Sequence, residues 1–124
     1  MVTATSTGRK YATQLTDGRG HYIFADVPDA GGGDLYQRPS ELIAEGYAAC
    51  MNITAQMLLA EQGYPMDQVE TRVEMDRRPD KTVFRAKTTI GGDVPEHVKA
   101  EILERITRCP VCKLLAGEKE FLPL

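Results

Sequence analysis

Residues 39–61 read PSELIAEGYAACMNITAQMLLAE and leave few polar gaps before Glu61. Pro39 or Ser40 suits the start of a helix, and Gly63 suits its end. The stretch therefore predicts a helix that is apolar on most of its faces and that must be buried. One sheet from a chain of 124 residues cannot cover such a helix on every side. We therefore expect a dimer that encloses the helices between sheets.

The segment before this helix indicates β-structure. Residues 11–15 and 21–27 alternate between apolar and polar side chains, and Asp17-Gly18 supplies a turn between them, which is typical of a hairpin. Residues 28–37 follow as a loop and include three successive glycines at 31–33. This loop is either a mobile rim over a site or a simple linker.

The segment after the helix indicates a second hairpin and two further helices. Residues 69–75 and 83–90 alternate around a turn at 77–80. Pro95 then opens an amphipathic helix, and the Cys-Pro segment begins a short helix that stops at Gly117. The apolar stripe of the amphipathic helix consists of Val98, Ile102, Leu103 and Ile106. We expect residues 121–124 to add a final short strand.

Size and composition limit the class of protein. A mass of 13.7 kDa fits one α+β domain over residues 1–124. The composition is that of a soluble globular protein, and the net charge of −3 argues against a general nucleic-acid binder. The chain has no apolar run of about 18 residues and no apolar core near its N-terminus, so we expect neither a membrane span nor a secretory signal. Three cysteines are too few for a disulfide scaffold, which favours the cytoplasm.

The cysteines are the main candidates for chemistry. Cys50 lies within the long helix, where a free cysteine is often an inert core residue. As a nucleophile it would need a nearby cation to become a thiolate. Cys109 and Cys112 form a Cys-Pro-Val-Cys motif at the start of a helix. The motif follows an amphipathic helix near the C-terminus, which disfavours a thioredoxin-like centre.

Zinc binding is the other interpretation of the three cysteines. It needs four ligands, and only His21 and His97 could join the three thiols. Neither histidine has useful spacing, so we expect two surface histidines and no metal.

Two segments resemble the OsmC/Ohr family, the osmotically inducible and organic hydroperoxide resistance proteins. Residues 38–51 are similar to the family's Pro-x-Glu-Leu helix start that leads to an Ala-Cys pair, and residues 108–112 are similar to its Cys-Pro-x-Ser motif. The resemblance implies an α+β fold and an intertwined homodimer, with the long central helix buried between β-sheets.

The resemblance also implies a chemistry, the thiol-dependent reduction of hydroperoxides, often organic ones. Cys50 would be the peroxidatic thiolate and would become a sulfenic acid. Cys109 would be the resolving thiol, and an external dithiol of the lipoyl or another type would restore both cysteines. No metal or organic cofactor is implied. The substrate pocket would be lined by residues such as Tyr47, Met51 and Leu42.

For the Ohr branch, the resemblance implies an N-terminal arginine, held by a glutamate at the helix start, as the cation beside the thiol. Arg9 resembles that arginine, and Arg38 is the rival. Ser40 stands where Ohr chains carry the glutamate, and Glu41 comes one residue later, which rotates its side chain by about 100° around the helix. Glu41 is therefore the candidate partner of Arg9 but not a direct equivalent, which favours the OsmC-like branch.

Two alternatives remain open. Cys112 replaces the family's usual serine, and it is either a passive substitute or a partner for Cys109 in a local disulfide. The chain as a whole could also be a non-catalytic dimer that binds a small apolar ligand or senses redox state. Contact between a cation and Cys50 would favour the enzyme.

Overall fold

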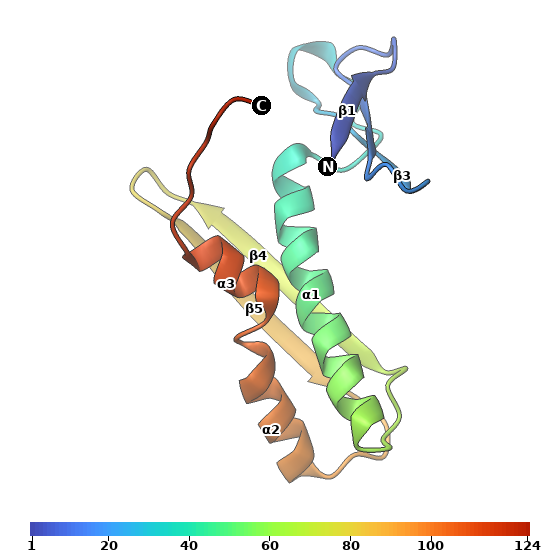
Figure 1. Cartoon of the computed structure of the whole chain (residues 1–124), viewed down its shortest axis with the longest axis vertical. Helices are drawn as coiled ribbons and strands as arrows, with labels where there is room; N and C mark the ends of the chain where they lie inside the picture. The colour runs from blue at the N-terminus through green and yellow to red at the C-terminus, as the bar shows by residue number, and fades with distance from the viewer. The chain divides into compact units, whose positions relative to one another are not determined.

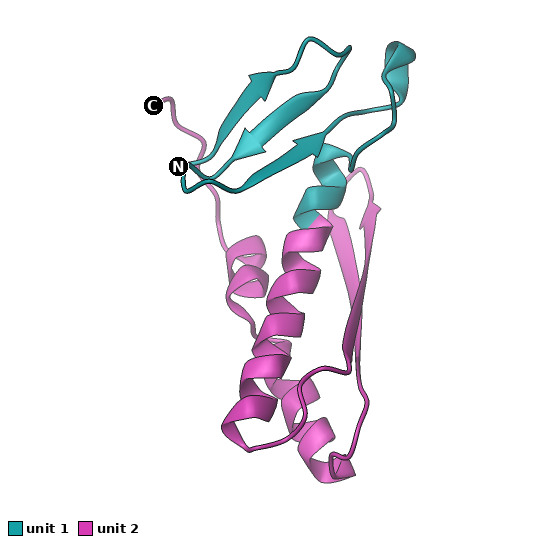
Figure 2. Cartoon of the chain, turned by 90° about the vertical axis from the view of Figure 1, so that its right-hand side faces the viewer, with its two compact units in different colours: residues 1–43 teal, residues 44–124 magenta.

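The computed structural model describes all 124 residues, which form two compact units, residues 1–43 and 44–124 (Figure 2). The boundary falls inside the long helix α1, Pro39–Glu61. The elements of unit 1 before it are β1 (Thr3–Ser6), β2 (Thr13–Thr16), β3 (Tyr22–Ala25) and the 3-10 turn η1 (Asp29–Gly31). Those of unit 2 after it are β4 (Val69–Arg77), β5 (Thr82–Ile90), α2 (Glu96–Ile106) and α3 (Pro110–Ala116).

Unit 1 contains an antiparallel sheet in the order β1-β2-β3. The hairpin predicted from residues 11–27 is confirmed as the pair β2 and β3, with Thr13 opposite Ala25. Strand β1 was not predicted, because all four of its side chains are exposed and its sequence, TATS, has no apolar alternation. It pairs with β2 in a register that sets Thr3 opposite Thr16.

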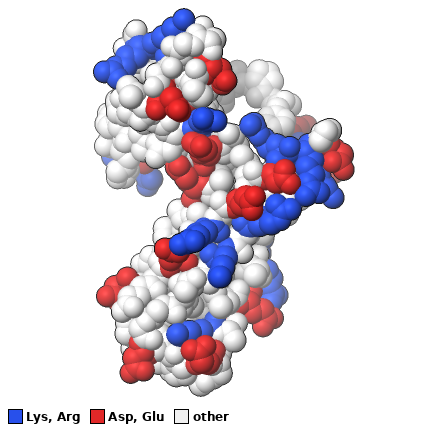
Figure 3. All heavy atoms as spheres, turned by 180° about the vertical axis from the view of Figure 1, so that it is seen from behind, with Lys and Arg blue, Asp and Glu red and all other residues white.

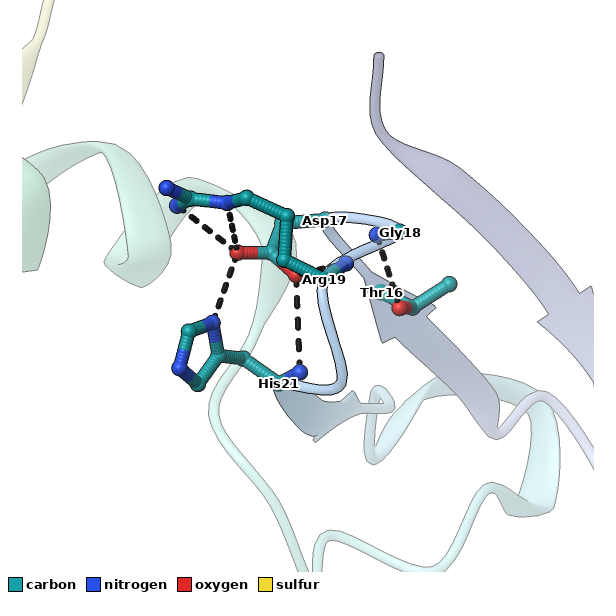
Figure 4. Close-up of polar contacts among 5 residues, drawn as sticks. All are labelled: Thr16, Asp17, Gly18, Arg19 and His21. Carbon is teal, nitrogen blue, oxygen red and sulfur yellow. Dashed lines mark hydrogen bonds and ion pairs between the residues drawn. The ribbon is translucent and has the colours of Figure 1, made fainter.

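The turn between β2 and β3 is organised by the carboxylate of Asp17 (Figure 4). It accepts hydrogen bonds from the backbone N–H of Arg19 at 2.8 Å and pairs with Nδ1 of His21 at 2.8 Å. These contacts, the His21 side chain first, lower the pKa of Asp17 below its usual value. Gly18 and Gly20 both have positive φ, which the turn requires.

The glycine-rich loop is pinned by a buried carboxylate. Asp26 is 3% exposed and accepts backbone hydrogen bonds from Leu35 at 2.9 Å and Tyr36 at 3.1 Å. Gly32 packs so closely against the backbone of Val27 that no Cβ fits there. The segment before α1 is therefore a folded loop.

Unit 2 stacks helices on one face of the two-stranded β4–β5 ribbon (Figures 1 and 2). The strands alternate as predicted, with Val69 and Val73 half-buried and Glu70 exposed. The core joins α1, α2, the end of β5 and the start of α3. Its buried members are Met51, Ala55, Leu58, Leu59, Ile90, Val94, Val98, Ile102, Ile106 and Cys109.

The short C-terminal helix ends at Gly117 as predicted, but the predicted strand over residues 121–124 is wrong. These four residues are exposed and lie outside any sheet. Pro123 lacks a backbone N–H, and no strand edge pairs with the segment, so its apolar side chains are insufficient to form a strand.

Within unit 2, other elements cover only one face of the long helix. Ala55 and Leu59 are fully buried, whereas Ile53 is 50% and Met57 is 61% exposed. Gly46 and Ala49 are exposed at helical spacing from Ile53 on the same side. This exposed side is called the α1 outer face below.

Charged side chains of both signs are interspersed on the face of the molecule shown in Figure 3. Along the β4–β5 ribbon they form exposed ion pairs, such as Arg72 with Glu70 at 2.8 Å and Arg78 with Asp76 at 2.9 Å. Exposed pairs of this kind contribute little stability. None of the helices combines the length and the hydropathy of a membrane span.

Candidate redox site

The fold brings the first two predicted cysteines together within unit 2. Cys50 lies on α1 and is half-buried, and Cys109 lies directly before α3 and is 1% exposed. Their side chains are adjacent, and Cys50 packs against the core cluster that contains Cys109. All three cysteines are free thiols.

Local sequence explains why Cys109 is fixed in this position. It is the residue before Pro110, which cannot continue a preceding helix and is the first residue of α3, while α2 ends earlier, at Ile106. The backbone N–H of Cys109 donates to Ile106 at 3.1 Å, and its carbonyl accepts from Lys113 at 3.1 Å. Both backbone groups are thus held while the thiol faces the core.

Burial is the main reason that the pKa of the Cys109 thiol lies above its usual value. The backbone N–H of Cys112 opposes this shift, while the neighbouring side chains of Cys50 and Cys112 add to it. A thiol in this position keeps its proton near neutral pH, so Cys109 is poorly suited to be the first nucleophile of the site.

Cys112 is half-buried and lies beside the phenol of Tyr47. Burial, followed by the hydrogen bond with Cys112, raises the pKa of Tyr47 to about 12. Tyr47 therefore remains a neutral hydrogen-bond donor throughout the physiological pH range. The structure thus gathers three thiols and one phenol, with Cys109 innermost.

A pocket of about 450 Å³ opens beside Cys112. The ring of Tyr47 meets that of Phe84 edge to face, with centroids 5.8 Å apart. The lining is completed by Thr82, Leu115 and Ala116. Of the predicted pocket residues in unit 2, Tyr47 lines this space, while Met51 is 4% exposed and belongs to the core.

Sequence reasoning did not single out Phe84 or Leu115. Phe84 lies opposite Met75 in the β4–β5 register, and both are half-buried. An aromatic residue on the inner face of a strand was the available signal, but nothing in the sequence linked it to Tyr47.

The predicted residues Arg9, Arg38, Glu41 and Leu42 belong to unit 1. The carboxylate of Glu41 accepts a 2.8 Å hydrogen bond from the backbone N–H of Arg38, which is half of a capping box at the start of α1. The Arg38 guanidinium lies 3.9 Å from Asp34. Arg9 is exposed and has no ion pair within its own unit. An arginine beside Cys50 stays a prediction.

Both histidines are exposed. His21 is exposed in the β2–β3 turn, and His97 is exposed on α2. No three His, Cys, Asp or Glu side chains form a group that could hold a metal ion.

The sequence matches the family described as OsmC-like protein over residues 31–121, so the chain belongs to the OsmC-like family. No curated protein matches it. The predicted family membership and the α+β OsmC-like fold are confirmed.

Solved structures share this fold at low sequence identity. An OsmC-like protein from Mycoplasma pneumoniae has a TM-score of 0.75 at 18% identity, covering 94% of this chain and 86% of that one. The organic hydroperoxide resistance protein OhrB of Bacillus subtilis has a TM-score of 0.59 at 24% identity, covering 94% and 90%. The organic hydroperoxide resistance protein OsmC from Legionella pneumophila has a TM-score of 0.61 at 22% identity, covering 94% and 88%.

Proposed function

We propose that the protein is a dithiol-dependent hydroperoxide reductase in which Cys50 attacks the peroxide and Cys109 resolves the product. The observation that carries the proposal is the adjacency of Cys50 on α1 to Cys109 at the start of α3. Membership of a family that includes hydroperoxide resistance proteins supports the same chemistry.

The division of roles follows from burial. A peroxidatic thiolate must meet substrate, and Cys50 is half-buried whereas Cys109 is 1% exposed. Cys50 attacks one peroxide oxygen, the O–O bond breaks, and an alcohol leaves, so that Cys50 becomes a sulfenic acid. The Cys109 sulfur then attacks the sulfur of that sulfenic acid, the Cys109 proton leaves with the sulfenic hydroxyl as water, and a disulfide forms. An external dithiol returns both cysteines to thiols.

An organic peroxide suits the surroundings of Cys50, which packs against a cluster of apolar core side chains. Apolar surroundings favour apolar ligands. Leu42 and Met51 stay predicted substrate contacts, and Arg9, with Glu41 as its predicted partner, stays the predicted cation that favours the Cys50 thiolate.

The working unit is proposed to be a homodimer. The α1 outer face exposes Ile53 and Met57 next to Gly46, an apolar stripe that an isolated chain would leave in water. Burying such a stripe against a second copy is the common solution for small proteins.

The deciding experiment is peroxide consumption by the reduced protein with cumene hydroperoxide and a dithiol. Cys50→Ser is expected to abolish turnover while keeping the fold, as judged by circular dichroism. Ala100→Ser is the control, because it adds a hydroxyl at an exposed position of α2 and leaves the thiols and the α1 outer face intact. Absence of turnover in the wild type, with Cys50 still reduced after exposure, would contradict the proposal and favour a ligand-binding protein.

A further inference from the structure

Of the three thiols, only that of Cys112 lines the 450 Å³ pocket. Cys109 is 1% exposed, and Cys50 is not among the residues that line the 450 Å³ pocket. Cys112 does line that pocket, together with Tyr47 and Phe84. A molecule that enters the pocket therefore meets the sulfur of Cys112.

This placement matters for the return of the enzyme to its reduced state. A disulfide between Cys50 and Cys109 would have one sulfur in the core, and thiol–disulfide exchange requires access of the attacking thiolate to a sulfur. Cys109 has neighbouring thiols on both sides, Cys50 from α1 and Cys112 from its own Cys-x-x-Cys motif. The motif lies at a helix start, where its two cysteines are one helical turn apart.

We propose that Cys112 is a third redox residue, which takes over the Cys50–Cys109 disulfide and presents it to an external dithiol in the pocket. The inference rests on the proposed function, since peroxide is the oxidant that forms the first disulfide.

The exchange conserves atoms and electrons. The thiolate of Cys112 attacks the sulfur of Cys109, a Cys109–Cys112 bond forms, and Cys50 leaves as a thiolate that is ready for the next peroxide. A dithiol then attacks the sulfur of Cys112, and Cys109 leaves. The second thiol of the reductant displaces Cys112, so the dithiol becomes a disulfide and both cysteines become thiols. The sum is peroxide plus dithiol to alcohol, water and disulfide.

Tyr47 acts as a positioning residue in this scheme. Its phenol lies beside the side chain of Cys112, and both residues line the same pocket. A neutral phenol can donate to the Cys112 thiolate when that sulfur attacks and again when it leaves.

The test follows disulfide connectivity after one equivalent of cumene hydroperoxide without reductant. After alkylation of free thiols, trypsin releases Cys109 and Cys112 together in residues 109–113 and Cys50 in residues 20–72. The wild type is expected to give an internal disulfide in 109–113 and alkylated Cys50. Cys112→Ser is expected to accumulate peptide 20–72 linked to 109–113.

Turnover supplies the second readout. Cys112→Ser is expected to consume the first equivalent of peroxide at the wild-type rate and then to turn over on the order of 10-fold more slowly with a dithiol. Val111→Ala is the control, because it changes the same motif and keeps all three thiols.

The two proposals fail in different ways. Consumption of peroxide with a persistent Cys50–Cys109 link in the wild type, or equal steady-state rates for wild type and Cys112→Ser, would overturn the relay alone. Absence of peroxide consumption would overturn the proposed function. Oxidation by diamide, which needs no peroxidatic step, then tests the connectivity of the three thiols independently. A Cys50–Cys109 link after diamide would likewise reject the relay.

Discussion

The side-chain amide of Asn52 donates a 2.9 Å hydrogen bond to the backbone carbonyl of Val69, which ties the middle of α1 to the first residue of β4. Asn52 also accepts a 2.6 Å hydrogen bond from the side-chain amide of Gln56, one turn further along the helix. Cys50 lies on the same helix two residues before Asn52, so this bond helps to fix the part of α1 that carries the thiol.

Replacement of Asn52 by alanine is therefore expected to lower the free energy of unfolding by about 1 kcal/mol, the usual net value of a partly buried hydrogen bond. Urea denaturation measures the change. Glu61→Ala, at the exposed end of the same helix, serves as the control and is expected to have little effect. Equal stability of Asn52→Ala and wild type would mean that water replaces the bond without cost.

Two neighbouring residues of helix α2 differ in burial, so their replacement measures how much packing against the core stabilises the protein. Ile102 is fully buried, and its neighbour Leu103 is half-buried. Ile102→Ala is expected to cost about 3 kcal/mol through lost burial and the cavity that remains, and Leu103→Ala about half as much. Thermal and urea unfolding give both values. The reverse order would show that α2 is rotated from its position in the structure.

The three thiols are expected to differ in reactivity toward iodoacetamide. Cys109 is 1% exposed and its pKa is raised by burial, so it should be alkylated last. Time-resolved mass spectrometry of the reduced native protein measures the order, and denatured protein, in which all three should react, is the control. Early modification of Cys109 in the native state would contradict its burial.

Alkaline pH should weaken the fold through Tyr47. Its pKa rises from 10.0 to about 12 on folding, so between these values the unfolded chain releases a proton that the folded chain retains. The contribution of Tyr47 to the free energy of unfolding is complete below pH 10 and is lost as the pH rises through about 12. Urea midpoints measured across this range should fall less steeply in Tyr47→Phe. Identical slopes for the wild type and Tyr47→Phe would show that the pKa of Tyr47 does not change on folding.

The α1 outer face gives a test of the proposed homodimer. Met57→Lys places a charge on this face and is expected to shift the protein toward monomer in sedimentation velocity. Met66→Lys is the matched control, because Met66 is 49% exposed after the end of the helix and Met57 is 61% exposed within it. A monomeric wild type, or a dimer that both variants leave intact, would argue against association through this face.

Elements with periodic apolar residues and clear ends could be predicted from the sequence. The helix from Pro39 ends at Glu61. Gly63, from which this end was predicted, follows the last turn and has a positive φ of 77°. Pro95 likewise marks the start of α2. Strand β1 gave no signal, because an exposed strand without alternation resembles a coil.

Less of the candidate redox site could be predicted from the sequence. Spacing alone offered Cys50 as a core residue, and its partnership with Cys109 came from the family resemblance. The contact of Tyr47 with Cys112 depends on how α3 packs against α1, which neither helix encodes locally. The pocket wall at Phe84 depends in addition on the register of β5.

The three glycines of the loop differ in which substitutions they can tolerate. A Cβ at Gly32 would lie 1.8 Å from the carbonyl oxygen of Val27, so no other residue fits without moving the backbone. A Cβ at Gly33 would meet Asp26 at an ordinary 3.5 Å, whereas Gly31 has a left-handed φ of 85° that strains any side chain. The three glycines are therefore unequally constrained: Gly33 should be the first to be replaced during evolution, and Gly32 the last.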